Sequence, residues 1–558
     1  MAQRLGVASR LLVPLVLLGW VVLAEAQPPS APAHTPAMIG AVPTVRPAVA
    51  AAREGLSAHP ASSALSAAAE PLTLTHGVAS GDVTAESAVV WARASGPALL
   101  HVEYDTDPLF RQPRSAPPRP VSEATDYTAT VVLQDLAPDT VYYYRAWLAR
   151  PDVPGPAAVS EPQTGRFRTA PGPTAQRPVS FVFGGDLGGQ RYCRSVDKGY
   201  AIFSAMEALA PDFFIALGDM IYADAECPAE GPDGWRNVPG DFPSVADPAV
   251  DWTNLTQLRE VYYKHWRYNR ADPHLQRFLA RTPLYAQWDD HEVINDFGGR
   301  WTYWNARTRD RAGYPNLVAA GREAFFHYTP IARQPADPER IYRRFVWSAD
   351  LELFLLDERS YRSRNDLLDT PANAKTLLGK EQLAWLKEGL RRSPATWKVV
   401  SGGVPLSIAT GGGPETGRDS WARGTEPGFA AQTGFQQELL DLLRFLDEHQ
   451  VRNLVWLAAD VHFPAQFRYE IDLNGDGVPL VFHELIAGPL SAARGPGPRP
   501  ERLDPLLKPT LLYGEGQLLN FGYVRLEPSA EGPARLIAEV RDETGAVRPG
   551  SRLELTPR

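Results

Sequence analysis

The chain has 558 residues, enough for two or three domains, and its 44% hydrophobic and 22% charged residues are those of an ordinary globular protein. The formal net charge of -9 argues against a general nucleic-acid binder, which needs a basic surface to pair with phosphates, so we expect no specific nucleic-acid partner. The 52 prolines and 45 glycines indicate many loops and a modest helix content.

Residues 1–26 have the features of a secretory signal peptide. An apolar run at residues 11–24 follows two arginines, and residues 24–26 read Ala-Glu-Ala, a small-x-small cleavage signature. The run is too short for a spanning helix, although a retained N-terminal anchor is the alternative interpretation. We therefore expect cleavage near Ala26, no stable membrane anchor, and a periplasmic or secreted protein. The absence of a twin-arginine pair favours the general secretory route.

Two segments precede the main part of the chain. Residues 27–70 are rich in Ala, Pro and Ser without a sustained period, which predicts a disordered or extended linker. Residues 71–171 contain short strands at regular spacing with turn signals between them, as in a β-sandwich of the immunoglobulin or fibronectin type. The Leu-x-Pro-x-Thr-x-Tyr-x-Tyr pattern that starts at Leu136 resembles the tyrosine corner of fibronectin-type domains. We expect this block to serve as a scaffold.

Residues 178–558 are predicted to form the catalytic domain. A strand at Val179–Phe183, a helix at Tyr200–Leu209 and a strand at Phe213–Leu217 begin an alternation that indicates an α/β layer. Later apolar runs, for example at Leu351–Leu356 and Asn453–Ala458, extend it with further strands.

Four of these predicted strands end in residues that can bind a metal ion. The candidates, in chain order, are Asp186, then Asp219 and Tyr222, then Asp290, His291 and Asn295, and finally Asp460 and His462. A single aspartate after a strand is more often a turn or a helix cap. Four such endings in one α/β domain predict a shared site at the carboxyl edge of the sheet, where ligands of open α/β sheets bind.

The ligand types predict the chemistry of this site. Carboxylates, one phenolate and one imidazole suit hard ions such as Fe(III), Mn, Ca or Mg. A bridging carboxylate can hold two ions about 3.5–4 Å apart, and such a pair polarises a phosphoryl oxygen and lowers the pKa of a bound water. We expect in-line attack of the resulting hydroxide on phosphorus, with His291 donating a proton to the leaving oxygen or stabilising its charge.

The two cysteines of the chain, Cys193 and Cys227, each follow one of the metal-site strands. If those strands are neighbours, both cysteines lie on loops at the same edge, and export would permit a disulfide between them. Two free thiols and two thiolate metal ligands are the alternatives.

The motifs around these residues resemble those of the PhoD-type alkaline phosphatases, within the metallophosphoesterase family, over about residues 72–523. The matching stretches are His76-Gly77-Val78-Ala79-Ser80-Gly81-Asp82 with Trp91, Leu217-Gly218-Asp219-Met220-Ile221-Tyr222-Ala223-Asp224, Trp288-Asp289-Asp290-His291-Glu292-Val293, Leu356-Asp357-Glu358-Arg359-Ser360-Tyr361-Arg362, and Asp460-Val461-His462.

The resemblance implies a fold class of α/β (α+β), with the β-sandwich followed by a four-layer αββα metallophosphoesterase domain. It also implies a site that holds Fe(III) and Ca²⁺, with Mn²⁺, Zn²⁺ or Mg²⁺ as alternatives at the second position. By this resemblance Asp219 bridges the two ions and His291 is the proton donor. The remaining ligands are Asp186, Tyr222 and His462 at iron, and Asp290 and Asp460, with Asn295 as a weaker candidate, at the second ion.

Arg359 and Arg362 follow another strand ending, and either guanidinium could pair with phosphate, with a structural salt bridge as the alternative. The sequence departs from the resemblance at Asp186, because many members of the family carry a cysteine ligand on the first strand. This difference bears on which metal the site prefers and on its pH optimum.

The function that we expect is that of an exported, metal-dependent phosphohydrolase, like alkaline phosphatase D, that cleaves phosphomonoesters and also diesters. Its partner is a small-molecule phosphate ester, and the chain is expected to be a monomer. The alternatives are a phosphodiesterase or phospholipase D-like enzyme, and a non-catalytic surface-binding protein on the same fold. The complete set of candidate ligands argues against the last of these.

Overall fold

The computed structural model describes residues 71–150, 158–298, 312–412, 416–425, 428, 432–529 and 532–558. The expected signal peptide at 1–26 and the expected linker at 27–70 lie outside the described residues. In the part of the chain that is described, no helix has both the length and the apolar character needed to cross a membrane.

Sheet A has nine strands and carries three of the four metal-site strand endings. Its order is β21-β20-β19-β9-β10-β11-β1-β2-β6. The strands are β1 (Leu74–Gly81), β2 (Ala88–Ala94), β6 (Thr128–Leu133), β9 (Val179–Gly184), β10 (Phe213–Ala216), β11 (Leu284–Ala286), β19 (Asn520–Ser529), β20 (Gly532–Asp542) and β21 (Leu553–Leu555). Strands β9, β10 and β11 are parallel, so their carboxyl ends lie at one edge.

Sheet C has seven strands in the order β12-β13-β14-β15-β17-β16-β18 and carries the fourth ending. The strands are β12 (Arg343–Ser348), β13 (Leu351–Leu355), β14 (Trp397–Ser401), β15 (Leu454–Ala458), β16 (Ala465–Ile471), β17 (Leu480–Ile486) and β18 (Thr510–Gly514). Strands β13, β14, β15 and β17 are mutually parallel.

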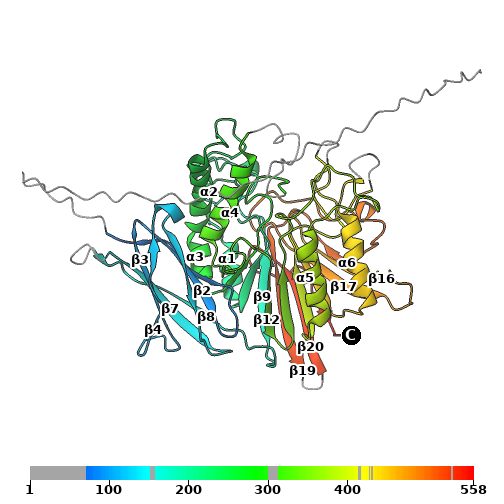
Figure 1. Ribbon diagram of the computed structural model, residues 1–558, viewed down its shortest axis with the longest axis horizontal. Helices are drawn as coiled ribbons and strands as arrows, with labels where there is room; N and C mark the ends of the chain where they lie inside the picture. Colours follow the sequence, from blue (N-terminus) through cyan, green and yellow to red (C-terminus); the bar gives the residue numbers. More distant parts are fainter. Residues whose placement is uncertain are drawn as a thin grey trace, which may run out of the picture. The chain divides into compact units, whose positions relative to one another are not determined.

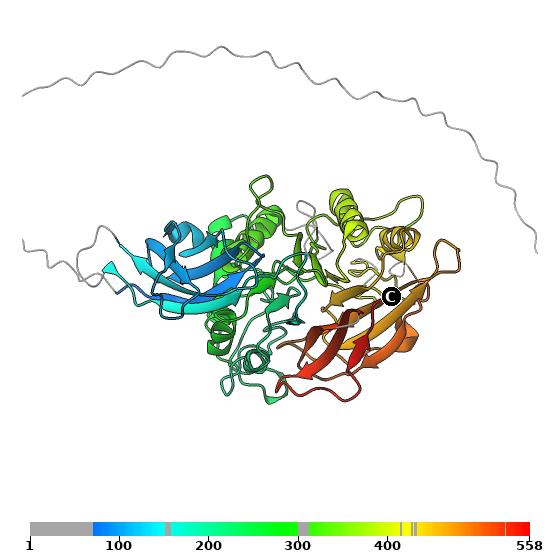
Figure 2. The ribbon, with the colours of Figure 1, turned by 90° about the horizontal axis from the view of Figure 1, so that it is seen from below.

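Sheet B forms the second layer of the N-terminal sandwich. It consists of β3 (Ala98–Asp105), β4 (Arg114–Ser115), β5 (Arg119–Val121), β7 (Val141–Ala149) and β8 (Gln163–Arg168). The first layer is β1, β2 and β6, and these strands continue sheet A because β1 pairs in parallel with β11 at Gly81 and Leu284. Figure 2 shows the blue strands of this layer and the red strands β19 to β21 at opposite ends of the sheet. The Tyr142 hydroxyl accepts a bond from the Ala137 N–H at 2.9 Å, the bond expected of a tyrosine corner.

The described helices form the two outer layers. They are α1 (Ile202–Ala208), α2 (Leu255–Arg270), α3 (Pro273–Leu279), α4 (Tyr314–Tyr328), α5 (Gly379–Arg392) and α6 (Gln436–Glu448), with short 3₁₀ turns η1 (Glu123–Thr125), η3 (Pro232–Gly234) and η5 (Pro500–Arg502). Helices α1 to α4 lie on one side of the paired sheets, and α5 and α6 lie on the other (Figure 1).

Alternation along the strands explains the layering. In β10, Phe213 and Ile215 join a core cluster with Val399 and Val455 of sheet C, whereas Phe214 belongs to the cluster under α1 to α4. Because successive side chains of a strand point to opposite faces, a strand that is apolar throughout must be covered on both sides. The expected αββα layering is therefore confirmed. All four metal-site strand endings project from the same edge of the two facing sheets.

Candidate metal centre

The predicted site residues meet at the carboxyl edge of β9, β10, β11 and β15. The backbone N–H of His291 donates to Asp219 Oδ1 at 3.0 Å, and the Tyr222 hydroxyl lies 2.9 Å from His462 Nε2. His462 Nε2 also lies 3.7 Å from Asp186 Oδ1. Two groups of three side chains, each with ligand atoms within 4.8 Å of one another, can hold a cation: Asp219, Asp290 and His291, and Asp289, Asp290 and Asp460.

The backbone around this site adopts a conformation that side chains disfavour. The φ angles are positive at four of the predicted ligands: 63° at Asp186, 52° at Asp219, 65° at Asp460 and 59° at His462. Left-handed conformations of this kind cost free energy and are concentrated at functional sites, where the surroundings hold them in place.

Glu292 holds two of the strand endings together. Its carboxylate is fully buried and accepts the backbone N–H groups of Asp219 at 2.9 Å, Met220 at 2.7 Å and Asp289 at 2.8 Å. The side chain therefore binds the turn after β10 to the turn after β11. This link between the two turns was not predicted from the sequence.

Burial and the repulsion between neighbouring carboxylates determine the pKa values of most aspartates in the site. Burial, with the neighbouring charges of Asp289 and Asp290, raises the pKa of Asp186, Asp219 and Asp460 well above the usual range. Burial acts in the same direction on Asp290, but Arg359 and His291 outweigh it and lower the pKa of that carboxyl. A cation at the centre of such a cluster relieves both the repulsion and the desolvation.

The donor set fits metal ions on two further observations. Among the described residues, Asp186 Oδ2, Asp290 Oδ1 and Asp460 Oδ2 are buried oxygens without a hydrogen-bond partner. Buried carboxylate oxygens of this kind are costly unless something else binds them. Oxygen donors with one imidazole match hard cations, so the residues present fit the metal ions that the sequence predicts.

His462 is held in the neutral form that a metal ligand needs. Its Nδ1–H donates to the carbonyl of Ala493 at 2.7 Å, which leaves Nε2 unprotonated, and Nε2 accepts from the Tyr222 hydroxyl at 2.9 Å. Burial lowers the pKa of His462 to about 4. An imidazole fixed in this way by a carbonyl is the usual arrangement of a metal-binding histidine. Burial and the charge of Asp219 raise the pKa of the Tyr222 hydroxyl, so binding as a phenolate requires a cation.

The surroundings of His291 raise its pKa, whereas those of His462 lower it. Its Nδ1 lies 2.6 Å from Asp224 Oδ1, and its ring stacks on that of Tyr222 with 4.0 Å between ring centres. Burial acts to lower the pKa of His291, but the carboxylates of Asp224 and Asp290 outweigh it and raise the pKa to about 10. The raised pKa favours the protonated imidazole, which carries a proton that it can donate.

Arg359 and Arg362 form buried ion pairs. The Arg359 guanidinium contacts Asp289 at 2.5 Å and Asp419 at 2.8 Å and lies 3.8 Å from Asp290, and Arg362 contacts Asp419 at 2.5 Å. Both side chains are 0% exposed. These ion pairs are those of the salt-bridge alternative, in which the arginines hold carboxylates of the site.

Asn295 is exposed, and its backbone N–H, not its side chain, contacts the site by donating to Asp224 at 3.0 Å. The neighbouring Asp296 joins Asp290 and Asp419 in a third group of converging carboxylates. Asp296 donates its own N–H to Asp290 at 2.6 Å.

Four carboxylates of the site were not assigned a role from the sequence: Asp224, Asp289, Asp296 and Asp419. The first two stand inside motifs that carried the family resemblance, so position in the motif was an available signal. Asp419 lies on a loop after β14 without any strand signal, and nothing in the local pattern marks it.

Cys193 and Cys227 form the expected disulfide, which joins the loop after β9 to the loop after Tyr222. The alternatives of free thiols and thiolate ligands are therefore wrong.

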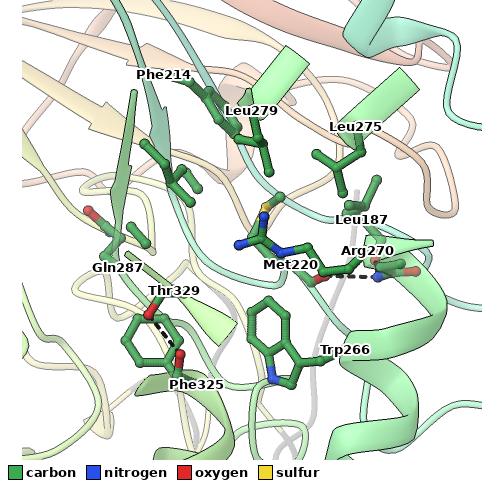
Figure 3. Close-up of a pocket in the computed structure, with 14 residues that line it drawn as sticks. Leu187, Phe214, Met220, Trp266, Arg270, Leu275, Leu279, Gln287, Phe325 and Thr329 are labelled. Carbon is green, nitrogen blue, oxygen red and sulfur yellow. Dashed lines mark hydrogen bonds between the residues drawn. The ribbon is translucent and has the colours of Figure 1, made fainter. Parts of the chain in front are cut away.

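A cavity of about 20 Å³ lies behind the β10 ending and is walled by Leu187 and Met220. Figure 3 shows the Arg270 guanidinium beside Met220 and Trp266 in this space. Substrate pockets enclose roughly 300–1,000 Å³, whereas this cavity has room for about one water molecule. It is part of the packing behind the site.

Comparison with known proteins agrees with this geometry. Residues 182–531 match the PhoD-like phosphatase family, and residues 59–171 match the PhoD-like phosphatase N-terminal domain. Alkaline phosphatase D of Bacillus subtilis (strain 168) is 24% identical over 467 residues, which are 78% of this chain and 72% of that protein.

Two solved structures share the fold. The structure of PhoD superposes with a TM-score of 0.65 at 20% identity and covers 87% of this chain and 92% of that one. Purple acid phosphatase PPD1 from yellow lupin (Lupinus luteus) seeds gives a TM-score of 0.54 at 14% identity, over 87% of this chain and 74% of that one. Because the family match at residues 182–531 spans more than half of the chain, the protein belongs to the PhoD-like phosphatase family and is a phosphoric ester hydrolase.

Proposed function

We propose that this phosphatase is an exported enzyme that depends on Fe(III) and Ca²⁺ and hydrolyses phosphomonoesters. The observation that carries the proposal is the convergence of buried carboxylates from four strand endings, three of which keep an oxygen without a partner. Cations among its oxygens would relieve the mutual repulsion of these carboxylates and the cost of burying them.

In this proposal Asp186, Tyr222 and His462 would hold Fe(III), Asp290 and Asp460 would hold Ca²⁺, and Asp219 would contribute to both positions. The bound ions supply positive charge that polarises the phosphoryl group and lowers the pKa of a water molecule. Asp186 replaces the cysteine that many relatives carry, so the first position has carboxylate, tyrosinate and imidazole donors, which suit the ferric state.

His291 donates the proton that the leaving oxygen needs. Asp224 fixes the ring through Nδ1 and keeps the imidazole protonated, so the proton available to the leaving group is on Nε2. Arg359 acts as a positioning residue, because its guanidinium holds Asp289 and Asp419 beside Asp290. Asn295 remains a weaker candidate as a ligand of the second ion, because it is exposed.

Metal analysis with a turnover assay tests the proposal. Purified protein should contain iron and calcium and should hydrolyse p-nitrophenyl phosphate faster than bis-p-nitrophenyl phosphate. Protein that binds no iron and stays inactive on both esters after reconstitution would refute it, and faster turnover of the diester would assign it as a phosphodiesterase.

Tyr222 gives the proposal a spectroscopic signature, because tyrosinate on Fe(III) produces visible charge-transfer absorption. Iron-loaded wild type should be coloured and Tyr222→Phe colourless at equal iron content. A colourless iron-loaded wild type would remove Tyr222 from the ligand set.

Export rests on the sequence of residues 1–26 and on the disulfide, which persists in oxidising compartments. Expression of the full chain should give mature protein that begins near Gln27 outside the cytoplasm, and N-terminal sequencing measures this. Recovery of the uncleaved chain in the cytoplasm would contradict it.

A further inference from the structure

The loop at residues 493–503, after β17, forms one wall of a pocket of about 230 Å³. Pro496, Pro498 and Leu503 of this loop face Ile408 of the loop after β14 and Phe463 of the loop after β15. An apolar cavity of about 150 Å³ holds a benzene molecule. The pocket therefore has room for an aromatic ring with one substituent.

The same loop holds His462 of the metal centre. The Ala493 carbonyl accepts the Nδ1–H of His462 at 2.7 Å, and the Gly495 N–H donates to the His462 carbonyl at 2.7 Å. A Cβ atom at Gly495 would lie 2.7 Å from the Val461 carbonyl oxygen, so only glycine permits this close packing. Pro496 follows Gly495 directly, which places the pocket wall next to the site along the chain.

Two arginines give the pocket a charged rim. Arg499 and Arg502 line it and are exposed, and within the described ranges neither has a carboxylate within 4.0 Å. Glu501 lies between them in the sequence and is also exposed, so the rim keeps a net positive charge. By contrast, Arg494 at the start of the loop has Asp233 within 3.7 Å.

We infer that this pocket binds the leaving group of the substrate and selects phosphate esters whose leaving group combines an apolar body with a second anionic group. The apolar wall accepts the body, and Arg499 and Arg502 pair with the second anion. The inference rests on the proposed function for the reacting phosphate and adds to it the class of leaving group.

A matched pair of aryl phosphates tests it. 4-Carboxyphenyl phosphate carries the second anion, and 4-carbamoylphenyl phosphate has the same shape without the charge. In the Arg499→Ala/Arg502→Ala double variant, KM for the carboxylate ester should rise about fivefold, as expected when two exposed ion pairs are lost, with kcat and the KM of the amide ester unchanged.

Two further variants separate charge from structure. Arg499→Lys/Arg502→Lys keeps the charge and should retain most of the preference for the carboxylate ester. Arg392→Ala, at the exposed end of α5, removes a surface arginine elsewhere and should change neither KM. Equal KM changes for both esters in the double alanine variant, or no change at all, would overturn the inference.

Binding of the phenol products tests the pocket's preference for an anionic leaving group without requiring catalysis. By calorimetry, wild type should bind 4-hydroxybenzoate about fivefold more tightly than 4-hydroxybenzamide, and the double alanine variant should bind the two equally. Wild type that turns over neither ester but shows this preference would refute the proposed function and keep the subsite. Wild type that binds both products equally, or binds neither, would refute the subsite whatever the activity.

Discussion

His291 and His462 reach one site from two different sheets, and their surroundings tune them in opposite directions. His462, after β15 of sheet C, donates to a backbone carbonyl and has a pKa that burial lowers to about 4. His291, after β11 of sheet A, faces Asp224 and Asp290, which outweigh burial and raise its pKa to about 10. The partner of Nδ1 therefore decides whether the ring is held neutral, as a ligand must be, or protonated, as an acid must be.

Removing the ligand should have the largest effect. His462→Ala deletes an imidazole from the proposed iron position, and we expect kcat to fall by more than about 100-fold, because even loss of a group that only orients a ligand costs up to that factor. Iron content should fall in parallel, measured by elemental analysis of the purified variant. Full iron content with full activity would show that His462 is not a ligand.

Removing the acid should leave the metals in place. His291→Ala should lower kcat by about 100-fold for phenyl phosphate, the range of general acid catalysis, while iron and calcium stay at wild-type levels. The loss should be smaller for p-nitrophenyl phosphate, because nitrophenolate leaves without a proton. Equal losses on the two esters would contradict the role of proton donor, and loss of metal would place His291 among the ligands.

Asp224→Asn tests the cause of the difference between the two rings. Loss of the carboxylate removes the largest interaction that raises the pKa of His291, so the folded enzyme keeps its imidazolium only to a lower pH. In the proposed mechanism the acid form is the active one, so the alkaline limb of the kcat profile should move to lower pH, with kcat reduced about tenfold at pH 8. An unchanged alkaline limb would show that another group controls it.

Much of this arrangement follows from local sequence pattern. Apolar runs that end in aspartate identified β9, β10, β11 and β15, because parallel buried strands place such residues at one edge. The disulfide followed from the positions of Cys193 and Cys227 after two of those strands. The α/β character followed from the alternation of strands and helices, and the αββα layering followed from the family resemblance.

The contacts that set the chemistry could not be predicted in this way. Asp224 meets His291 across 67 residues of chain, and Arg359 meets Asp419 across 60. Both contacts depend on how loops from different strands pack, which no local period records. Tertiary packing also determines the burial of Arg359 and Arg362 and the pairing of β1 with β11, so neither could be predicted from local sequence.

The smallest effect is expected for Asn295, which contacts His291 indirectly through Asp224. The structure uses its backbone N–H to hold Asp224, whereas its side chain is exposed. Asn295→Ala keeps that N–H, so kcat, calcium content and the alkaline limb should stay within about twofold of wild type, as for other exposed positions away from special features. A loss of calcium in this variant would return Asn295 to the ligand set of the second ion. Unchanged calcium would leave that position to carboxylates alone, with the Asn295 backbone acting through Asp224 on the protonation of His291.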